Sequence, residues 1–279
     1  MLYLILILSI ICLSYFFYLA YKNTKDIKIN KIEINPSNFS KANKSNLNKP
    51  LTILHLSDLH LENISLTPQQ LNDKLTNESV DLIALTGDFL DRKRTIPKLI
   101  PYLRVLNNLK PTHGIYAVLG NHDYVLKGEA LRKLKYTLEE FGCIVLQNAS
   151  ETISFYGQTV NIIGIDDFST NRSNVDAAYR NVKKGKNIVL THDPNVILHM
   201  GNYTFDYLMA GHFHGGQICY PKAYHLVKMG RLARNNIIKG LHMHERKPFY
   251  ISEGLGQTGL NIRVGSRPEI TFHDVLIHD

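Results

Sequence analysis

Five apolar, β-prone runs dominate the pattern of this chain, and each is followed at once by a cluster of polar side chains. The runs cover residues 51–56, 81–86, 114–119, 187–190 and 205–210. Short continuous apolar runs of this kind indicate strands that are buried on both faces. Each predicted strand therefore has a rigid end, and the polar cluster begins the loop that follows it.

Segments with a helical pattern lie between these runs. Thr67-Pro68-Gln69-Gln70 offers a capping residue, a proline at the first helical position and a glutamine at the third, so a helix is predicted over 68–76. Further helices are predicted near 97–109, where Pro101 disturbs the pattern, over 128–141 and over 174–182.

The second half of the chain adds strands that alternate more regularly. Residues 152–165 predict a hairpin, and the stretches 249–252 and 269–277 predict strands in the tail. Because strands come from both halves of the chain and helices separate them, we predict the α/β class. Two sheets packed as a sandwich and flanked by helices are the natural architecture.

Residues 1–21 form an apolar segment without a charged residue. At about 1.5 Å per residue, a helix of this length just crosses the hydrocarbon core of a bilayer. Aromatic residues gather near its distal end, between Tyr15 and Tyr21, as they do at membrane interfaces. The alternative is a cleaved signal peptide, but a positive start is missing and Tyr18-Leu19-Ala20 is a poor cleavage site. We therefore expect a retained transmembrane anchor over 1–21.

Positive charge is concentrated directly after this segment. Of the formal net charge of +8, residues 22–50 carry +5, from seven lysines against Asp26 and Glu33. We predict a Lys/Asn-rich linker over 22–50, and a short strand built on the isoleucines of 27–34 is the alternative. Since these cations follow the apolar segment and none precedes it, we expect a single-pass protein of the inner (cytoplasmic) membrane. Residues 51–279 would then lie on the cytoplasmic side.

The rest of the chain is only weakly basic. Residues 51–279 retain a net charge of about +3, which does not indicate a nucleic-acid partner. The three cysteines, Cys12, Cys143 and Cys219, lack CxxC spacing, so no disulfide framework is predicted. Some 230 residues is the size of one large α/β domain, and we predict a single domain over 51–279.

The polar clusters at the strand ends carry the chemistry. They are Ser57-Asp58-Leu59-His60, Gly87-Asp88, Gly120-Asn121-His122-Asp123, Thr191-His192-Asp193 and Gly211-His212-Phe213-His214. If the five strand ends converge, they place carboxylates, an amide and several imidazoles around one cleft. Oxygen and imidazole ligands without thiolate suit manganese, iron or zinc rather than a structural cysteine site.

The order of these clusters resembles the calcineurin-like metallophosphoesterase superfamily, whose pattern is D-x-H, G-D, G-N-H-[DE], a lone H and G-H-x-H. The resemblance covers about residues 51–279. Within the superfamily the chain is most similar to the bacterial membrane-associated phosphodiesterase and UDP-2,3-diacylglucosamine pyrophosphatase-like branch, on Leu54–His60, Gly211–Gln217 and the Gly254–Ile270 stretch. The resemblance implies a four-layer α/β/β/α sandwich.

The resemblance also implies two divalent metal ions, Mn²⁺ first, with iron and zinc as alternatives. Asp88 would bridge them. The first ion would take Asp58, His60, Asp88 and His214, and the second would take Asp88, Asn121, His192 and His212. A hydroxide shared by the ions would attack the phosphorus, so a serine or cysteine nucleophile is not needed, and neither GxSxG nor a P-loop is present.

The resemblance gives His122 the role of protonating the leaving alkoxide or stabilising the charge on the phosphate. Asp123 follows it and is predicted to orient it, with a helix-cap or turn residue as an equally weighted alternative. Asp91-Arg92 is interpreted as a loop ion pair, and Asp166-Asp167 as a turn. The remaining histidines singled out as structural or surface residues are His199, His225, His242, His244, His273 and His278.

Residues 215–246 form a basic, glycine-containing segment directly after the last predicted ligand, so we expect it to border the cleft. Arg231 or Arg234 is predicted to bind a second phosphate of the substrate, and the apolar side chains to meet an acyl chain or the membrane. An ordinary solvated loop is the alternative.

The predicted activity is metal-dependent hydrolysis of a phosphodiester or diphosphate bond. A lipid-linked substrate such as UDP-2,3-diacylglucosamine, from lipid A synthesis, is the leading specific candidate. A broad-specificity phosphodiesterase is the alternative, and a nuclease or a non-catalytic scaffold is weaker still.

Overall fold

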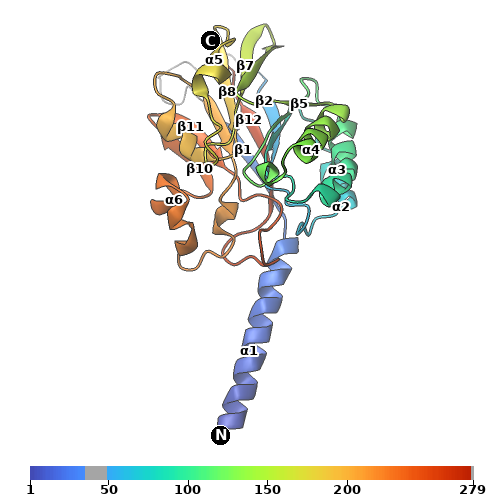
Figure 1. Ribbon diagram of the computed structural model, residues 1–279, viewed down its shortest axis with the longest axis vertical. Coiled ribbons are helices and arrows are strands. Elements are labelled where there is room, and N and C mark those ends of the chain that lie inside the picture. The colour runs from blue at the N-terminus through green and yellow to red at the C-terminus, as the bar shows by residue number, and fades with distance from the viewer. Residues whose placement is uncertain (35–48, 278–279) are drawn as a thin grey trace.

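Two six-stranded sheets carry the polar clusters (Figure 1). The computed structural model describes residues 1–34 and 49–277. The strands are β1 (Lys28–Ile34), β2 (Leu51–Leu56), β3 (Leu82–Thr86), β4 (Ile115–Val118), β5 (Cys143–Val145), β6 (Ala149–Phe155), β7 (Gln158–Ile165), β8 (Lys186–Thr191), β9 (Tyr207–Ala210), β10 (Gly240–His244), β11 (Lys247–Ile251) and β12 (Glu269–Val275). The first sheet has the order β1-β12-β2-β3-β4-β5, and the second has the order β10-β11-β9-β8-β7-β6.

Helices flank the two sheets, apart from the long N-terminal helix, which projects away from them (Figure 1). The α-helices are α1 (Leu2–Lys22), α2 (Pro68–Leu75), α3 (Ile96–Asn108), α4 (Glu129–Glu140), α5 (Val175–Tyr179) and α6 (Arg231–Arg234). Short 3-10 turns are η1 (Asn23–Lys25), η3 (Lys93–Thr95), η4 (Asp123–Val125), η5 (Pro194–His199), η6 (His214–Gly216) and η7 (Tyr224–Lys228).

Three apolar layers hold the sandwich together. One lies between the first sheet and α2, α3 and α4. A second lies between the two sheets, and the third lies between the second sheet and the segment that holds α5, η5 and α6. The predicted four-layer α/β/β/α fold is therefore confirmed.

Burial on both faces explains why the strand sequences are continuously apolar. In β2, Leu51 and Ile53 face the second sheet, whereas Leu54 and Leu56 face the helices. Every other residue of a strand points to the same face, so a strand in the middle of a sandwich needs apolar side chains at both parities.

Most of the predicted elements are present, with shifted ends. Thr67 caps α2, and its side chain and that of Gln70 form the reciprocal capping box. The helix α3 continues through Pro101, while α5 is shorter than the predicted helix at 174–182. Strands β5 and β10 were not predicted, because short strands at or near a sheet edge carry little periodic signal.

The segment after the apolar helix differs from the predicted linker. Residues Lys28–Ile34 form β1, which pairs in parallel with β12, so the alternating isoleucines do make a strand. Burial of Ile34 against the sandwich core stabilises this pairing. The rest of the predicted linker, residues 35–48, lies outside the described part of the chain.

Strand direction fixes which end of the sandwich holds the polar clusters. The chain leaves α1, and β1 runs away from it; β12 is parallel to β1, and β2 is antiparallel to β12. Strands β3 and β4 are parallel to β2, so the carboxyl ends of all three point back toward α1 (Figure 1). The apolar helix and the strand ends with the polar clusters therefore share one end of the molecule.

Candidate metal centre

Two groups of side chains at the strand ends have the composition and spacing of metal sites. The first group is Asp58, His60, Asp88 and His214, and the second is Asp88, His192 and His212. Within each group, one potential ligand atom per residue lies within 4.8 Å of the others, and all these residues are buried. The structure therefore brings together six of the seven predicted ligands in these two groups.

Asp88 belongs to both groups, and one oxygen atom makes the connection. Its Oδ2 lies 3.4 Å from His60 Nε2 and 3.1 Å from His192 Nε2. Its Oδ1 accepts a hydrogen bond from the backbone N–H of His122 at 2.8 Å. A carboxylate held between two imidazole sets in this way has the geometry that a bridging ligand needs.

The backbone at the site is strained in a consistent way. Asp58, His60, Asp88, His212 and His214 all have positive φ, a region that residues other than glycine seldom adopt. Such conformations persist only where the surrounding structure holds them, and they gather at functional sites. Here each one turns a side chain from the end of a strand into the cluster.

Close backbone approach at the site requires glycine. A Cβ on Gly120 would collide with the carboxylate of Asp88, and one on Gly211 would collide with Ser57 and Asp58. The first contact joins the ends of β3 and β4 within one sheet and the second joins the two sheets, so the backbone packs tightly enough to bury the carboxylates.

Backbone carbonyls orient two of the histidines. His192 Nδ1 lies 2.7 Å from the Thr86 carbonyl oxygen, and His214 Nδ1 lies 3.2 Å from that of Gly256. A carbonyl only accepts, so each Nδ1 carries a proton and each Nε2 faces the cluster, where the neutral form of the ring offers its lone pair. This is the arrangement in which an outer hydrogen bond prepares an imidazole for a metal ion.

Asn121 completes the donor set that the sequence predicted. Its Oδ1 is buried, lines a cavity of about 320 Å³ together with Asp88 and His212, and has no hydrogen-bond partner among residues 1–34 and 49–277. A buried amide oxygen without a partner is costly unless a cation or donor occupies the position in front of it. The residues present therefore fit a pair of divalent ions.

Electrostatics at the site also favour a divalent cation. Burial disfavours the charged form of His60, but the nearby carboxylates of Asp88 and Asp91 outweigh this and raise its pKa to about 10. The pKa of His192 is raised too, because Asp88 outweighs the effect of burial. Burial lowers the pKa of His214 to about 3. Metal ions bind neutral imidazole, so ion binding would replace protons that balance the buried carboxylates.

His122 lies beside the cluster, and its hydrogen-bond partner is Asp91. Its Nδ1 is 2.9 Å from Asp91 Oδ1, and the same oxygen is 3.6 Å from His60 Nδ1. Burial lowers the pKa of His122, but the hydrogen bond with Asp91 prevails and the net pKa is raised. His122 also lines the cavity of about 320 Å³, which we call the smaller cavity, and there it can meet a substrate.

Two predictions about carboxylates near His122 are wrong. Asp123 does not contact the His122 ring; its oxygens accept backbone N–H bonds from Asp88, Phe89, Leu90 and Gly120 at 2.8–3.3 Å. Asp91 orients His122 instead of forming an ion pair with Arg92, which is exposed. The turn alternative for Asp123 was therefore the better interpretation. The prediction for Asp123 relied on its position next to His122 in the sequence, but consecutive side chains point in different directions. Asp91, three residues after Asp88, returns to the same side of the loop.

The remaining predictions about polar residues can now be placed. Asp166 and Asp167 follow β7 and come directly before a turn that begins at Phe168, and Asp166 accepts a hydrogen bond from Tyr124. His273 is fully buried and contacts the Tyr207 hydroxyl, while His199 is exposed and stacks on Phe168. His278 lies outside the described residues. His225 is exposed at the smaller cavity.

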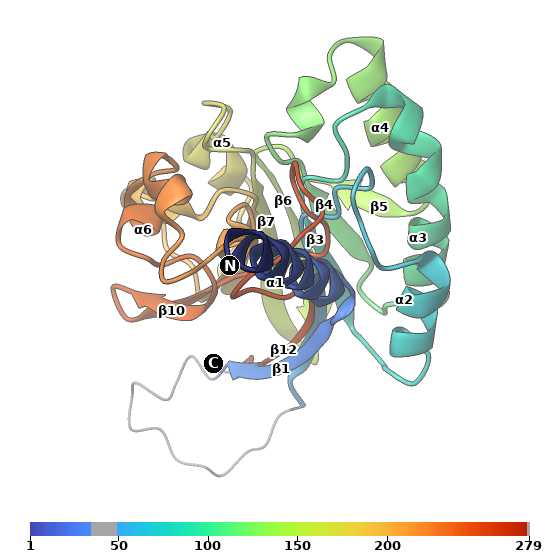
Figure 2. The same ribbon diagram turned by 90° about the horizontal axis from the view of Figure 1, so that it is seen from below.

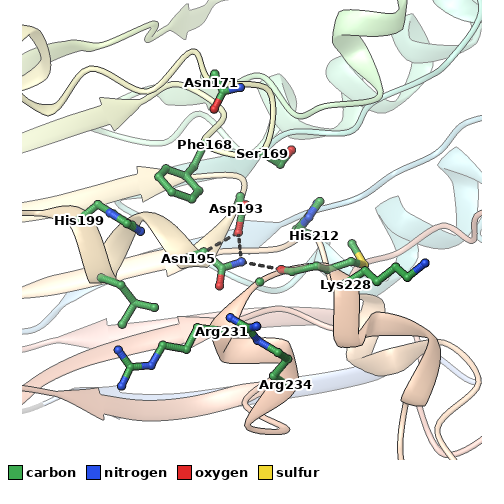
Figure 3. Close-up of a pocket in the computed structure, with 13 residues that line it drawn as sticks. Phe168, Ser169, Asn171, Asp193, Asn195, His199, His212, Lys228, Arg231 and Arg234 are labelled. Carbon is green, nitrogen blue, oxygen red and sulfur yellow. Dashed lines mark hydrogen bonds between the residues drawn. The ribbon is translucent and has the colours of Figure 1, made fainter.

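The basic segment 215–246 borders the site, as predicted. Arg231 and Arg234, together with Lys228, line a second cavity of about 710 Å³ that begins at His212 (Figure 3). Asn195 holds this wall in place, since its side chain bonds Asp193 Oδ1, the Met229 carbonyl and the Leu232 N–H. Phe168 and His199 form the opposite, aromatic side, and sequence reasoning did not connect them with the site.

A family comparison agrees with this geometry. Residues 51–216 match the family described as Calcineurin-like phosphoesterase. The chain belongs to the calcineurin-like phosphoesterase family. As a member of this family it is a phosphoester hydrolase, and its buried Asp and His cluster is suited to divalent metal ions.

Relatives of this phosphoesterase include two proteins named metallophosphoesterase and one named pyrophosphatase. A Bacillus subtilis strain 168 protein called uncharacterized metallophosphoesterase YkoQ is 59% identical over 271 residues, covering 97% of this chain and 98% of that protein. A Helicobacter pylori metallophosphoesterase is 30% identical over 208 residues, covering 72% of this chain and 52% of that protein. UDP-2,3-diacylglucosamine pyrophosphatase LpxG of Chlamydia trachomatis is 27% identical over 255 residues, covering 72% of this chain and 76% of that protein.

Replacing the shared carboxylate should empty the cluster. Asp88→Asn removes the charge that both groups use, so we expect metal content to fall well below two ions per chain and turnover to fall by at least 10³-fold. Metal analysis of the purified protein measures this. The matched control is Asp166→Asn, which changes a buried carboxylate outside the cluster. A content of two ions in Asp88→Asn would refute the shared position.

Substitution of Asp91 and substitution of Asp123 should have different effects on stability and on turnover. Asp123→Asn turns one acceptor oxygen into a donor that faces backbone N–H groups, so the free energy of unfolding should fall by about 1–3 kcal/mol. Asp91→Asn should leave that free energy within about 0.5 kcal/mol, because the side chain is partly exposed, but should lower kcat. Denaturant unfolding and kinetics on both variants check this. The opposite pattern would restore Asp123 as the partner of His122.

Proposed function

We propose that this phosphoesterase is a membrane-anchored, binuclear metal-dependent enzyme that hydrolyses a phosphodiester or diphosphate bond. The observation that carries the proposal is the position of Asp88 Oδ2 between His60 and His192. The first ion is held by Asp58, His60, Asp88 and His214, and the second by Asp88, Asn121, His192 and His212, with Mn²⁺ as the leading candidate and iron or zinc as alternatives. When bound, such a pair activates a water molecule and neutralises the oxygens of the phosphate.

His122 supplies the proton in this proposal. A water oxygen forms a bond to phosphorus as the bond from phosphorus to the leaving oxygen breaks, and that oxygen needs a proton. Asp91 accepts from His122 Nδ1 at 2.9 Å, which leaves Nε2 as the donor toward the cavity. The raised pKa of His122 favours the protonated form that a general acid requires.

The larger cavity supports a substrate with a second anionic group. Arg231, Arg234 and Lys228 lie beyond His212, outside the two metal groups. A planar guanidinium binds a phosphate through two parallel hydrogen bonds, so the cavity suits the far phosphate of a diphosphate. The name of the Chlamydia relative, a UDP-2,3-diacylglucosamine pyrophosphatase, makes that lipid-linked diphosphate of lipid A synthesis the first substrate to test.

A broad-specificity phosphodiesterase is the second candidate. The observation that favours it is that the arginines line only the larger cavity, which adjoins the smaller one at His212: a small diester needs only the cavity that Asp88, Asn121 and His122 line. Hydrolysis of such a diester would not involve the arginines.

We further propose that α1 anchors the enzyme in the inner (cytoplasmic) membrane. It is the one helix in the described part of the chain that is long and apolar enough to cross a bilayer. Most of its side chains are exposed to their surroundings, unlike those of a core helix. The lysines that follow support a cytoplasmic position of the catalytic domain, because cations favour that face of the membrane.

Loss of the proton donor should depend on the leaving group. For His122→Ala we expect unchanged metal content and a kcat lowered by about 10²–10⁴-fold on alkyl phosphodiesters, where the alkoxide needs a proton. The loss should be much smaller on aryl phosphodiesters with nitrophenolate leaving groups. Steady-state kinetics on both series decide this, with His244→Ala on β10 as the control. Equal losses on both series would contradict the acid role.

Loss of the two arginines should affect the kinetics of the two candidate substrates differently. Arg231→Ala combined with Arg234→Ala should raise KM for UDP-2,3-diacylglucosamine at least tenfold, because the second phosphate loses its partners. KM and kcat for a small aryl phosphodiester should stay within twofold. Arg180→Ala, an exposed arginine elsewhere, is the control. Equal effects on both substrates would mean that the arginines support the fold of the segment. No turnover of the lipid by the unmodified enzyme would favour the broad-specificity candidate.

The orientation has its own test. A fluorescent protein fused after Asp279 should be bright, and alkaline phosphatase fused there should be inactive, because each reports the compartment in which it folds. An active phosphatase fusion would place the domain on the outer side. A mature protein that begins after Ala20 would show cleavage instead of anchoring.

A further inference from the structure

The base of α1 is fixed to the catalytic domain. The backbone N–H of Arg263 donates to the Ala20 carbonyl at 2.9 Å, and Asn23 Nδ2 donates to the Arg263 carbonyl at 2.9 Å. Thr24 is fully buried, with its hydroxyl 2.7 Å from that of Ser65. Arg267 adds an ion pair to Asp26 at 3.0 Å. These contacts hold the last turn of the helix against the domain and so set the orientation of the domain to the helix axis. We call this set of contacts the helix mount.

Arg263 connects the helix mount with the metal centre. Its guanidinium is buried and donates to the carbonyls of Glu253, Gly254 and Gly256 at 2.7–3.1 Å. The Gly256 carbonyl is also the one that faces His214 Nδ1, and the Gly256 N–H donates to the Asp58 carbonyl. The loop that orients a cluster histidine is thus tied directly to the helix.

Apolar side chains are exposed on the loops around the smaller cavity. They are Ile218, Tyr220, Tyr224, Val227 and Leu260, with exposed fractions of 41%, 84%, 65%, 46% and 66%. We call these five residues the docking rim. Ile218 and Leu260 line the cavity that also holds Asp88 and Asn121, so the rim lies at the entrance to the metal centre. Exposed apolar side chains grouped on neighbouring loops indicate an interaction surface.

The docking rim is continuous with the base of α1. Ile218 forms a β-bridge with Val264, and the Cys219 N–H donates to the Val264 carbonyl. Val264 follows Arg263, which contacts Ala20. Viewed along α1, the orange segment before α6 and the red segment before β12 lie beside the helix (Figure 2). The rim therefore faces the same side as the helix, at the level where the helix leaves the domain.

Lysines accompany these apolar side chains. Lys222 and Lys228 are exposed between the rim residues, and Lys22 and Lys25 are exposed at the base of the helix. Lys25 lies over the Tyr21 ring, with its Nζ 4.6 Å from the ring centre. Tyrosines and lysines at one level are typical of a protein surface that meets the headgroup layer of a membrane, and lysines there favour anionic lipids.

We propose that the docking rim rests on the surface of an anionic bilayer, so that the metal centre opens directly onto the headgroup layer. The proposal rests on the proposed anchoring by α1 and deepens it, because the helix mount holds the rim against the membrane instead of letting the domain swing freely. The substrate class that follows is a phosphate ester or diphosphate exposed at the membrane surface, with its acyl chains remaining in the lipid.

The position of the rim can be measured on the full-length chain in nanodiscs of phosphatidylglycerol and phosphatidylcholine. In a Cys12→Ala, Cys219→Ala background, Tyr220→Cys and Tyr224→Cys carry an environment-sensitive fluorophore. Tyr156→Cys is the matched control, since Tyr156 is 71% exposed in the β6–β7 turn at the opposite end of the sandwich. Lipids brominated in the acyl chain should quench the probes at 220 and 224 at least twofold more than the probe at 156.

Two results would overturn the proposal. Equal quenching at 220 and 156 would mean that the rim does not reach the bilayer. Protection of the 220 probe from aqueous iodide without quenching by brominated lipid would mean that another protein chain covers the rim. Both readouts are independent of activity, so they remain decisive if the chain proves to hydrolyse a different phosphoester from the one proposed.

A second experiment measures the hydrolytic activity of the double variant Tyr220→Glu, Tyr224→Glu. Hydrolysis of a phosphodiester lipid embedded in the nanodisc should fall at least tenfold, and hydrolysis of a soluble aryl phosphodiester should stay within twofold. Tyr156→Glu should change neither. Equal losses on the two substrates would show that the tyrosines support the site itself, which overturns their assignment to membrane contact.

Discussion

Burial of two carboxylates in one cluster is the constraint on which the rest of this structure depends. Asp58 and Asp88 are both almost completely inaccessible, and each buried charge costs several kcal/mol unless partners compensate it. Imidazoles from both sheets surround them, and the donor set fits a pair of divalent ions. The close contact at Gly120, within one sheet, and that at Gly211, between the sheets, follow from the same requirement, because tight packing excludes water.

Two further buried side chains, Asp123 and Arg263, hydrogen-bond to backbone groups and shape the loops around the site. Asp123 gathers four backbone N–H groups and so shapes the loop that presents Asp88. Arg263 gathers backbone carbonyls from the loop that orients His214. One carboxylate and one guanidinium thus each hold a loop of the centre in place. Their hydrogen bonds also offset the cost of burying their own charges.

The direction of the strands places the metal cluster at the same end of the molecule as the apolar helix. Because β1 leaves α1 and β2 runs antiparallel to β12, the carboxyl ends that carry the ligands return to the helix end of the molecule. A different strand order would have placed the same residues on the far side of the sandwich. With this order, the cluster lies at the helix end of the molecule, as the proposed anchoring by α1 requires for a substrate at the membrane surface.

The sequence by itself determined the local elements and the identity of most of the site. Apolar runs indicated strands buried on both faces, and polar clusters at their ends indicated the ligands, because the side chain at a strand end is positioned by the strand. It did not determine that Lys28–Ile34 is a strand, since a half-exposed edge strand has a pattern that a polar linker can share. Only the tertiary structure decided that Asp91 and not Asp123 holds His122, because the path of the loop sets which carboxylate faces the ring. It likewise decided that Arg263 joins the apolar helix to the metal centre. Contacts between residues some 240 positions apart leave no periodic signal in the chain, so only the packed fold brings them into view.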